Sequence, residues 1–325
     1  MFNKFLKEKV IHKPRLGLAL SGGGARGLIH IGILKVLKQH GIAVDYIAGT
    51  SMGGVIAAGY AVGMSPTEME NIACEVLHIQ NILRFIDPAL PDGGLIRGQK
   101  LLEFFKRHIG EREFADLNIP LALVAVDLNT AQEVVLKEGS IALALRATTA
   151  VPGIFTPLEF NRWRLIDGGV LNNLPVDVLK QMGADKVIAV NCRPPHVSGT
   201  LSWISNHRFV PKGFTTTMRN FVATLSILLT ATEKQKLQKF PPDLLIQPQI
   251  PSDINLFAGY DRVKELIDIG EKAAEQKLPE IESILKNHWQ LYRIRDFHHG
   301  HINSMTTISS KQSIQNGQSM YGYKG

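Results

Sequence analysis

The sequence predicts an α/β fold built on a sheet with parallel strands. The chain has 325 residues, of which 45% are hydrophobic and 20% charged, as is typical of a soluble globular protein. Two short apolar runs, at 15–21 and 44–50, are each followed directly by a helical pattern. This alternation is typical of parallel strands, because a parallel connection needs a crossover segment that is usually a helix.

The first predicted strand and helix are separated by a glycine-rich loop. The strand is RLGLALS at 15–21, and the helix covers 26–41. Its apolar side chains recur at helical spacing, at Leu28, Ile31, Leu34 and Leu37. Gly41 is a natural end for this helix. The second strand, VDYIAGT at 44–50, leads into Ser51 and a helix rich in alanine and glycine at 52–63.

The remaining elements alternate less regularly. Residues 65–118 are expected to be helical and irregular, with a loop at 91–99. The elements predicted next are two strands within 120–139, a helix at 140–150, a loop at 151–157, a strand at 162–167, a helix at 174–183 and a strand at 186–191. After a polar loop at 196–213 we expect a long helix at 214–238, a strand at 242–250 and a charged helix at 261–289.

These elements are assigned to a single domain at 16–295, with a motif core at 16–191 and a helical C-terminal part at 214–290. Residues 1–15 form a basic leader, and the polar tail at 296–325 is expected to be disordered. The helix at 214–236 carries an apolar stripe formed by Phe214, Met218, Phe221, Leu225 and Leu228. Packing of this stripe onto the core is favoured, and a lid or a membrane-facing helix is the alternative.

Composition narrows the function classes. The formal charge is +7, but no nucleic-acid-binding signature accompanies it, so no nucleic-acid partner is expected. The charge is read as a solvated surface, with attraction to anionic lipid headgroups as the alternative. Two cysteines cannot form a disulfide framework, and no apolar run has the length of a membrane span. We therefore expect a cytoplasmic protein, with peripheral membrane contact left open.

The loop SGGGARG at 21–27 allows two interpretations. Gly22, Gly24 and Gly27 match the dinucleotide-binding pattern and stand between a strand and a helix. In that reading Asp45 lies near the distance of an acid that would bind ribose. However, Asp45 is predicted to begin its strand, which is the wrong edge of the sheet for a ribose.

A second motif stands where the next strand meets its helix. Gly49-Thr50-Ser51-Met52-Gly53 fits the G-x-S-x-G turn of a nucleophile elbow, whose flanking positions must be small. The alternative for Ser51 is a helix N-cap. If the first two strands are adjacent, backbone amides of Gly22, Gly23 and Gly24 reach the same sheet edge as Ser51 and form an oxyanion hole. Arg26 either supports this loop, attracts an anionic substrate or is a plain surface residue.

The base for Ser51 is predicted to be an aspartate. Asp167 ends the strand RWRLI, and Gly168 and Gly169 clear space beside it. An aspartate at that edge can reach a serine on the same edge, although an Asp-Gly turn is the alternative.

Among the eleven histidines, His196 and His207 lie in the polar loop after the last core strand, and neither has a supporting motif. His30 lies on the first helix, where a packed or surface histidine is the default. His30 and His196 are kept as the alternative bases.

The motifs SGGGARG, GTSMG and DGG, in this order, resemble the patatin-like phospholipases, a family of lipid acyl hydrolases. The resemblance runs from about Leu16 to about Asn191. It implies a three-layer α/β/α fold with a mainly parallel sheet, and a Ser51–Asp167 dyad without a histidine. It also implies oxyanion donors at Gly22, Gly23 and Gly24. The position before Asp167 where the family usually has a serine is Thr148 here, which is a conservative change.

The resemblance implies hydrolysis of a lipid ester through an acyl-enzyme, with no cofactor and no metal. Gly49, Gly53, Gly168, Gly169 and Arg26 are the expected supporting residues. Two other functions stay open: a nucleotide-binding oxidoreductase, and a non-catalytic regulatory protein that keeps the fold. The sequence defines neither the lipid and acyl position nor the oligomeric state.

Overall fold

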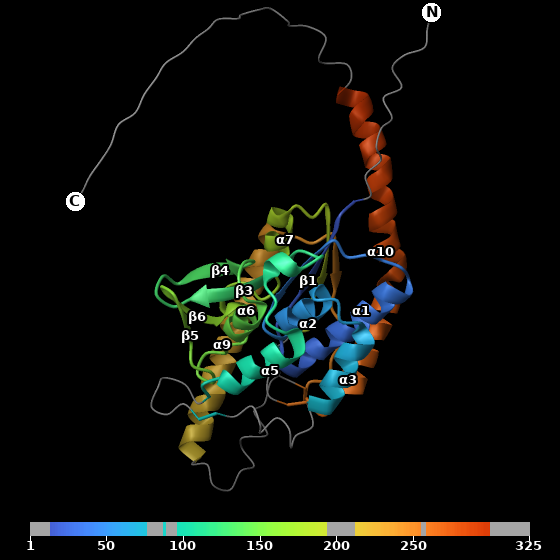
Figure 1. Ribbon diagram of the computed structural model, residues 1–325. Coiled ribbons are helices and arrows are strands. Elements are labelled where there is room, and N and C mark those ends of the chain that lie inside the picture. The colour runs from blue at the N-terminus through green and yellow to red at the C-terminus, as the bar shows by residue number, and fades with distance from the viewer. Residues whose placement is uncertain (1–13, 77–86, 89–95, 194–211, 255–257, 300–325) are drawn as a thin grey trace, which may run out of the picture.

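The computed structural model describes residues 14–76, 87–88, 96–193, 212–254 and 258–299 (Figure 1). Most of the predicted leader, the polar loop at 196–211 and the tail from residue 300 lie outside these ranges. The predictions made for those three segments therefore stay predictions.

One mixed sheet of eight strands forms the centre of the fold. Its strands are β1 (Leu16–Leu20), β2 (Tyr46–Thr50), β3 (Leu121–Asp127), β4 (Gln132–Leu136), β5 (Leu158–Phe160), β6 (Trp163–Asp167), β7 (Lys186–Val190) and β8 (Leu244–Ile246). The order is β5-β6-β3-β2-β1-β7-β8, and β4 also pairs with β3. The pairs from β3 through β2, β1 and β7 to β8 are parallel, whereas those of β4, β5 and β6 are antiparallel. The parallel part of the sheet confirms the prediction.

The described helices follow the predicted order. They are α1 (Ile29–Gln39), α2 (Met52–Ala61), α3 (Pro66–Val76), α5 (Gln99–Ile109), α6 (Ile141–Thr148), α7 (Val176–Met182), α9 (Lys212–Lys239) and α10 (Val263–His299). Short 3₁₀ helices occur at η1 (Gly24–Leu28), η3 (Phe114–Asp116) and η4 (Gly168–Val170). Among the described residues, no helix is both long and apolar enough to cross a membrane.

Helices cover both faces of the sheet. Leu16, Leu18 and Leu20 of β1 belong to the larger apolar cluster, which also contains the buried side chains of α1 and α10. Ala19, between them, belongs to a second cluster with α7 and Leu237 of α9. Since neighbouring residues of a strand point to opposite faces, α1 and α10 lie on one side of the sheet and α7 on the other. The α/β fold has the three predicted layers (Figure 1).

Two predictions about elements need correction. Strand β5 was not predicted, because a run of three residues has no readable alternation. The charged helix expected at 261–289 extends to His299 as α10.

The stripe on α9 was expected to pack onto the core. The side chains of its members Phe214, Met218, Phe221 and Leu225 lie outside the described residues. The fifth member, Leu228, is 58% exposed, and its neighbour Ile227 is 59% exposed. Contact of this helix with a membrane surface stays a prediction.

Helices α1 and α10 cross at backbone contact, which requires glycine on both. A Cβ added at Gly32 would lie 2.1 Å from the carbonyl oxygen of Ile267. A Cβ added at Gly270 would lie 2.0 Å from the carbonyl oxygen of Ile29. Neither backbone atom can move without separating the helices, so only glycine fits at both positions.

Gly270→Ala is therefore expected to lower the free energy of unfolding by about 3 kcal/mol, in spite of the higher helix propensity of alanine. Chemical denaturation with urea measures the change. The matched control is Lys272→Ala, two residues along and exposed, which should change stability by less than about 0.5 kcal/mol. Equal stability of the two variants would contradict the close crossing.

Candidate active site

The two predicted catalytic residues meet because β2 and β6 share one edge of β3. Leu123 and Val124 pair with β2 on one edge and with β4 on the other. Ala125 pairs with both β4 and Asp167 of β6. Strands β2 and β6 therefore lie end to end along the same edge of β3. Thr50 pairs with Val124 and Asp167 pairs with Ala125, so the C-terminal ends of β2 and β6 meet. Ser51 directly follows Thr50 and therefore lies close to Asp167.

Ser51 occupies a sharp turn between β2 and α2. Its backbone has φ 53° and ψ −127°, a conformation that a residue with a side chain rarely adopts. The side chain makes no capping hydrogen bond to the helix, which argues against the N-cap alternative. The Ser51 amide donates to Oγ1 of Thr148 at 2.9 Å, and Thr148 donates in turn to Val124 O. The strained turn is thus held from α6 and leaves the hydroxyl for chemistry.

The glycines flanking Ser51 are required by close backbone approaches. A Cβ at Gly49 would lie 2.5 Å from the backbone of Gly53, and one at Gly53 would lie 2.3 Å from Leu20 O. The turn therefore packs directly against itself and against the end of β1. This confirms that both positions must be small, as the elbow pattern requires.

Asp167 lies at the end of β6 and is 6% exposed. Its Oδ1 accepts a hydrogen bond from the Gly169 amide at 2.8 Å, and its carboxyl also has the Ser51 hydroxyl as a hydrogen-bonding partner. Burial raises the pKa of Asp167 to about 6, although these two hydrogen bonds and the charge of Arg193 oppose the rise. A carboxylate with this pKa is a stronger base than a free aspartate and is still ionised at neutral pH. The backbone carbonyl of Val124 leaves no room for a side chain at Gly168.

The glycine loop lies beside Ser51, but its three backbone amides differ in whether they already donate a hydrogen bond. A Cβ at Gly22 would lie 3.0 Å from Ser51 Cβ, so the loop approaches the nucleophile closely. The Gly22 amide donates to Asn173 O at 3.2 Å and is not free to bind an oxyanion. For the amides of Gly23 and Gly24 the described residues provide no such acceptor outside the short helix η1. Gly24 has φ 59°, which turns the chain into that helix.

Arg26 and His30 make hydrogen bonds that fix the two ends of the glycine loop. Nε of Arg26 donates to Ile254 O at 2.7 Å, which favours the loop-supporting role among its three interpretations. His30 is fully buried, and its Nε2 donates to Ser21 O at 2.9 Å. Burial lowers the pKa of His30 to about 4 in spite of that hydrogen bond. His30 is therefore a packed, neutral histidine, and His196 lies outside the described residues.

Asp45 lies at the opposite end of the sheet from Ser51. It precedes β2 and accepts a hydrogen bond from the Leu16 amide at 2.7 Å, where β1 begins. The glycine loop follows the other end of β1. The acid that the dinucleotide interpretation requires is therefore a strand length away from the loop. In the part of the chain that the structure describes, no group of three metal-binding side chains occurs.

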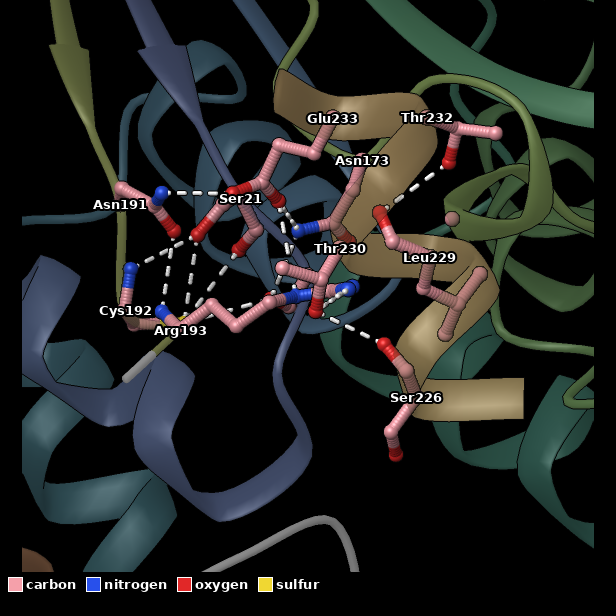
Figure 2. A network of polar contacts seen from close by, with 12 residues as sticks. Ser21, Asn173, Asn191, Cys192, Arg193, Ser226, Leu229, Thr230, Thr232 and Glu233 are labelled. Atoms are coloured by element: carbon pink, nitrogen blue, oxygen red, sulfur yellow. Dashed lines mark hydrogen bonds and ion pairs between the residues drawn. The ribbon is translucent and has the colours of Figure 1, made fainter. Parts of the chain in front are cut away.

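The sequence did not predict a buried polar network that adjoins the glycine loop. Asn173 Nδ2 donates to Glu233 Oε2 at 2.7 Å and to Gly22 O at 3.4 Å. Asn191 Nδ2 donates to the other oxygen of Glu233 at 2.7 Å, and Arg193 pairs with Glu233 at 3.5 Å (Figure 2). The polar pair Asn172-Asn173 soon after Asp-Gly-Gly was the available signal. Nothing in the local sequence points to Glu233, which lies 60 residues further along in α9.

Comparison with known proteins bears on this site. A family model described as patatin-like phospholipase matches residues 18–180, about half of the chain. An uncharacterised NTE family protein of Mycobacterium tuberculosis is 35% identical over 188 residues, which are 57% of this chain and 51% of that protein. Patatin-like phospholipase domain-containing protein 6 of Mus musculus is 33% identical over 189 residues, 56% of this chain and 14% of that protein.

The chain thus spans about half the length of its mycobacterial relative and a small part of the mouse protein. Among solved structures, VipD from Legionella pneumophila has a TM-score of 0.45 at 15% identity. That likeness covers 83% of this chain and 67% of the other. The family match begins within β1 and ends within α7, so it includes the glycine loop, Ser51 and Asp167.

Proposed function

Because the chain belongs to the patatin-like phospholipase family, we propose that it is a serine hydrolase of lipid carboxylic esters. In this proposal Ser51 is the nucleophile and Asp167 is its base. The observation that carries it is that β2 and β6 end next to each other on β3, at Val124 and Ala125. This brings a serine with a strained backbone, whose side chain does not cap the helix, close to a buried carboxylate. The mouse relative, which is named for a patatin-like phospholipase domain, supports a lipid substrate.

The reaction would proceed through an acyl-enzyme. Ser51 Oγ attacks the ester carbonyl while Asp167 accepts its proton, and the alcohol or lysolipid leaves with that proton. Asp167 then takes a proton from a water molecule, whose oxygen attacks the acyl carbonyl. The bond from the acyl carbon to Ser51 Oγ breaks, Asp167 returns the proton to Ser51, and the fatty acid is released. The residues involved require no cofactor for these steps.

The oxyanion would be stabilised by the glycine loop. The amides of Gly23 and Gly24 are the proposed donors, since the Gly22 amide is engaged with Asn173. Gly22 would contribute by its lack of a side chain, because a Cβ there would stand beside Ser51. The sequence-based proposal of three donors is thereby reduced to two.

Serine-directed labelling tests the proposal against its alternatives. The protein is incubated with a fluorophosphonate, and the modified peptide is identified by mass spectrometry. It is also assayed with a short p-nitrophenyl ester and a panel of phospholipids, lysophospholipids and acylglycerols. We expect labelling at Ser51 and hydrolysis of at least one ester. The panel identifies which class of lipid is hydrolysed. Absence of both from folded protein would favour a regulatory role, and binding of a nicotinamide dinucleotide would favour the oxidoreductase.

The pH dependence of hydrolysis should report Asp167. Only the ionised carboxylate accepts a proton, so kcat/KM should fall about ten-fold per pH unit below about 6 and stay level above it. The rate is measured between pH 4.5 and 8 with a soluble ester, and circular dichroism checks that the protein stays folded. A profile that instead bends near pH 7, with no bend near 6, would point to a histidine base.

A further inference from the structure

We infer that Glu233 of α9 is a positioning residue for the catalytic pair, acting through the side chain of Asn173. The inference rests on the proposed function. Glu233 lies on a helix outside the residues matched by the family model. Among the described residues its carboxylate binds Asn173, Asn191 and Arg193, and neither Ser51 nor Asp167. Its effect on them would pass through one carboxamide.

The carboxamide of Asn173 has one possible orientation. Its Nδ2 faces two acceptors, Glu233 Oε2 at 2.7 Å and Gly22 O at 3.4 Å. An ionised carboxylate and a carbonyl accept hydrogen bonds but cannot donate them, so Oδ1 cannot take the place of Nδ2. Glu233 therefore decides which way the amide of Asn173 points.

In this orientation Oδ1 of Asn173 lies close to two glycines that adjoin the catalytic pair. A Cβ at Gly22 would lie 2.7 Å from this oxygen and 3.0 Å from Ser51 Cβ. A Cβ at Gly169 would lie 3.2 Å from the same oxygen and 3.1 Å from Asp167 Oδ1. The oxygen thus stands between the glycine that adjoins Ser51 and the glycine that holds Asp167.

The backbone of the same segment ties the two halves of the site. Asn173 O accepts the Gly22 amide at 3.2 Å, and Asn172 O accepts the Thr50 hydroxyl at 2.8 Å. Residues 172–173 therefore contact both the glycine loop and the strand end before Ser51. A shift of Asn173 would move the loop relative to the nucleophile.

Glu233 needs both of its oxygens for this arrangement. Oε2 accepts from Asn173 and Oε1 from Asn191, each at 2.7 Å, and Arg193 balances the charge (Figure 2). A glutamine has a single acceptor oxygen, so Glu233→Gln leaves one asparagine facing an NH₂ group. Asn191 Oδ1 also accepts the Arg193 amide at 2.9 Å, which prevents Asn191 from turning to adapt.

The test compares Glu233→Gln with Leu237→Ala, one turn away on α9. Leu237 packs against the second apolar cluster and docks the same helix, and its side chain makes no hydrogen bond to residues 172–173. We expect Glu233→Gln to lower kcat and the rate of fluorophosphonate labelling about ten-fold or more, with KM changed less than about two-fold. Leu237→Ala should lower thermal stability at least as much while leaving kcat near that of the wild type.

A double variant then separates positioning from general damage. In Glu233→Gln/Asn191→Asp the new carboxylate accepts from the glutamine NH₂, and the glutamine oxygen is free for Asn173. The net charge beside Arg193 is also unchanged. We expect kcat to return to within about three-fold of the wild type, since the two changes are coupled.

Equal losses of kcat in Glu233→Gln and Leu237→Ala would overturn the inference, as would a double variant no faster than Glu233→Gln. Failure of the proposed function has a different signature. In that case the wild type itself would show neither labelling at Ser51 nor hydrolysis, and the inference would fall with it.

Discussion

Ser51→Ala is expected to lower kcat for ester hydrolysis at least about a thousand-fold and to abolish fluorophosphonate labelling. The Ser51 hydroxyl is the only protein group in the proposal that forms a bond to the acyl carbon. The amides of Gly23 and Gly24 remain in the variant, so residual turnover by water is expected. Steady-state kinetics on the ester preferred by the wild type, at equal concentrations of folded protein, measures the loss.

Ser51→Gly is the matched variant for this position. It also lacks the hydroxyl and should be as inactive as Ser51→Ala. However, glycine adopts φ 53° and ψ −127° without strain, so we expect unfolding to cost about 1 kcal/mol more than in the alanine variant. Hydrolysis by either variant at a rate near that of the wild type would remove Ser51 from the mechanism. Equal stability of the two variants would contradict the strained elbow.

Asp167→Asn is expected to lower kcat about 10³-fold, because an amide cannot accept the proton of Ser51. The carboxamide keeps an oxygen for the Gly169 amide, so the shape of the site should be preserved. The two kcat values are best compared at pH 8. Asp167 of the wild type is ionised there, so the difference between the wild type and the variant is largest. Substantial activity in this variant would show that another group, for example His196, is the base.

The same substitution should stabilise the protein at high pH. The pKa of Asp167 in the folded state is raised from 3.8 to about 6. Below the unfolded-state pKa, a carboxyl whose folded-state pKa is raised does not reduce the free energy of unfolding. As the pH rises through the folded-state pKa, the buried carboxyl ionises and the protein becomes less stable. Asparagine carries no charge, so Asp167→Asn should add up to about 3 kcal/mol to the free energy of unfolding at pH 8.

At pH 4 the gain from Asp167→Asn should disappear, because Asp167 of the wild type is then largely protonated in the folded state. Urea denaturation of both proteins at the two pH values measures the difference. A gain of equal size at pH 4 and pH 8 would show that it does not come from the ionisation of Asp167.

Local sequence was sufficient for most of the elements and for the proposed catalytic residues. The glycine loop, Ser51 and Asp167 each follow an apolar strand that a pattern of a few residues reveals. The alternation of these strands with helices predicted the parallel part of the sheet. The resemblance carried by the same motifs implied the family, which comparison with known proteins has confirmed.

The proposed use of the glycine loop could be predicted only in part. Three glycines in a row indicate free amides, but they do not reveal which amide a distant carbonyl accepts. Asn173 O takes that of Gly22. Leu228 shows the same limit on the surface, because its helical spacing suggested burial whereas the side chain is exposed.

What the sequence alone determined is therefore chemical: a candidate nucleophile, a carboxylate as its candidate base, and small residues at the positions where backbones meet. What the tertiary structure decided is how these groups are placed and held. The end-to-end meeting of β2 and β6 on β3 joins segments more than a hundred residues apart. Glu233 reaches Asn173 from a helix with no motif of its own. Strand register and side-chain hydrogen bonds over such separations depend on the packing of the whole chain, which no local pattern encodes.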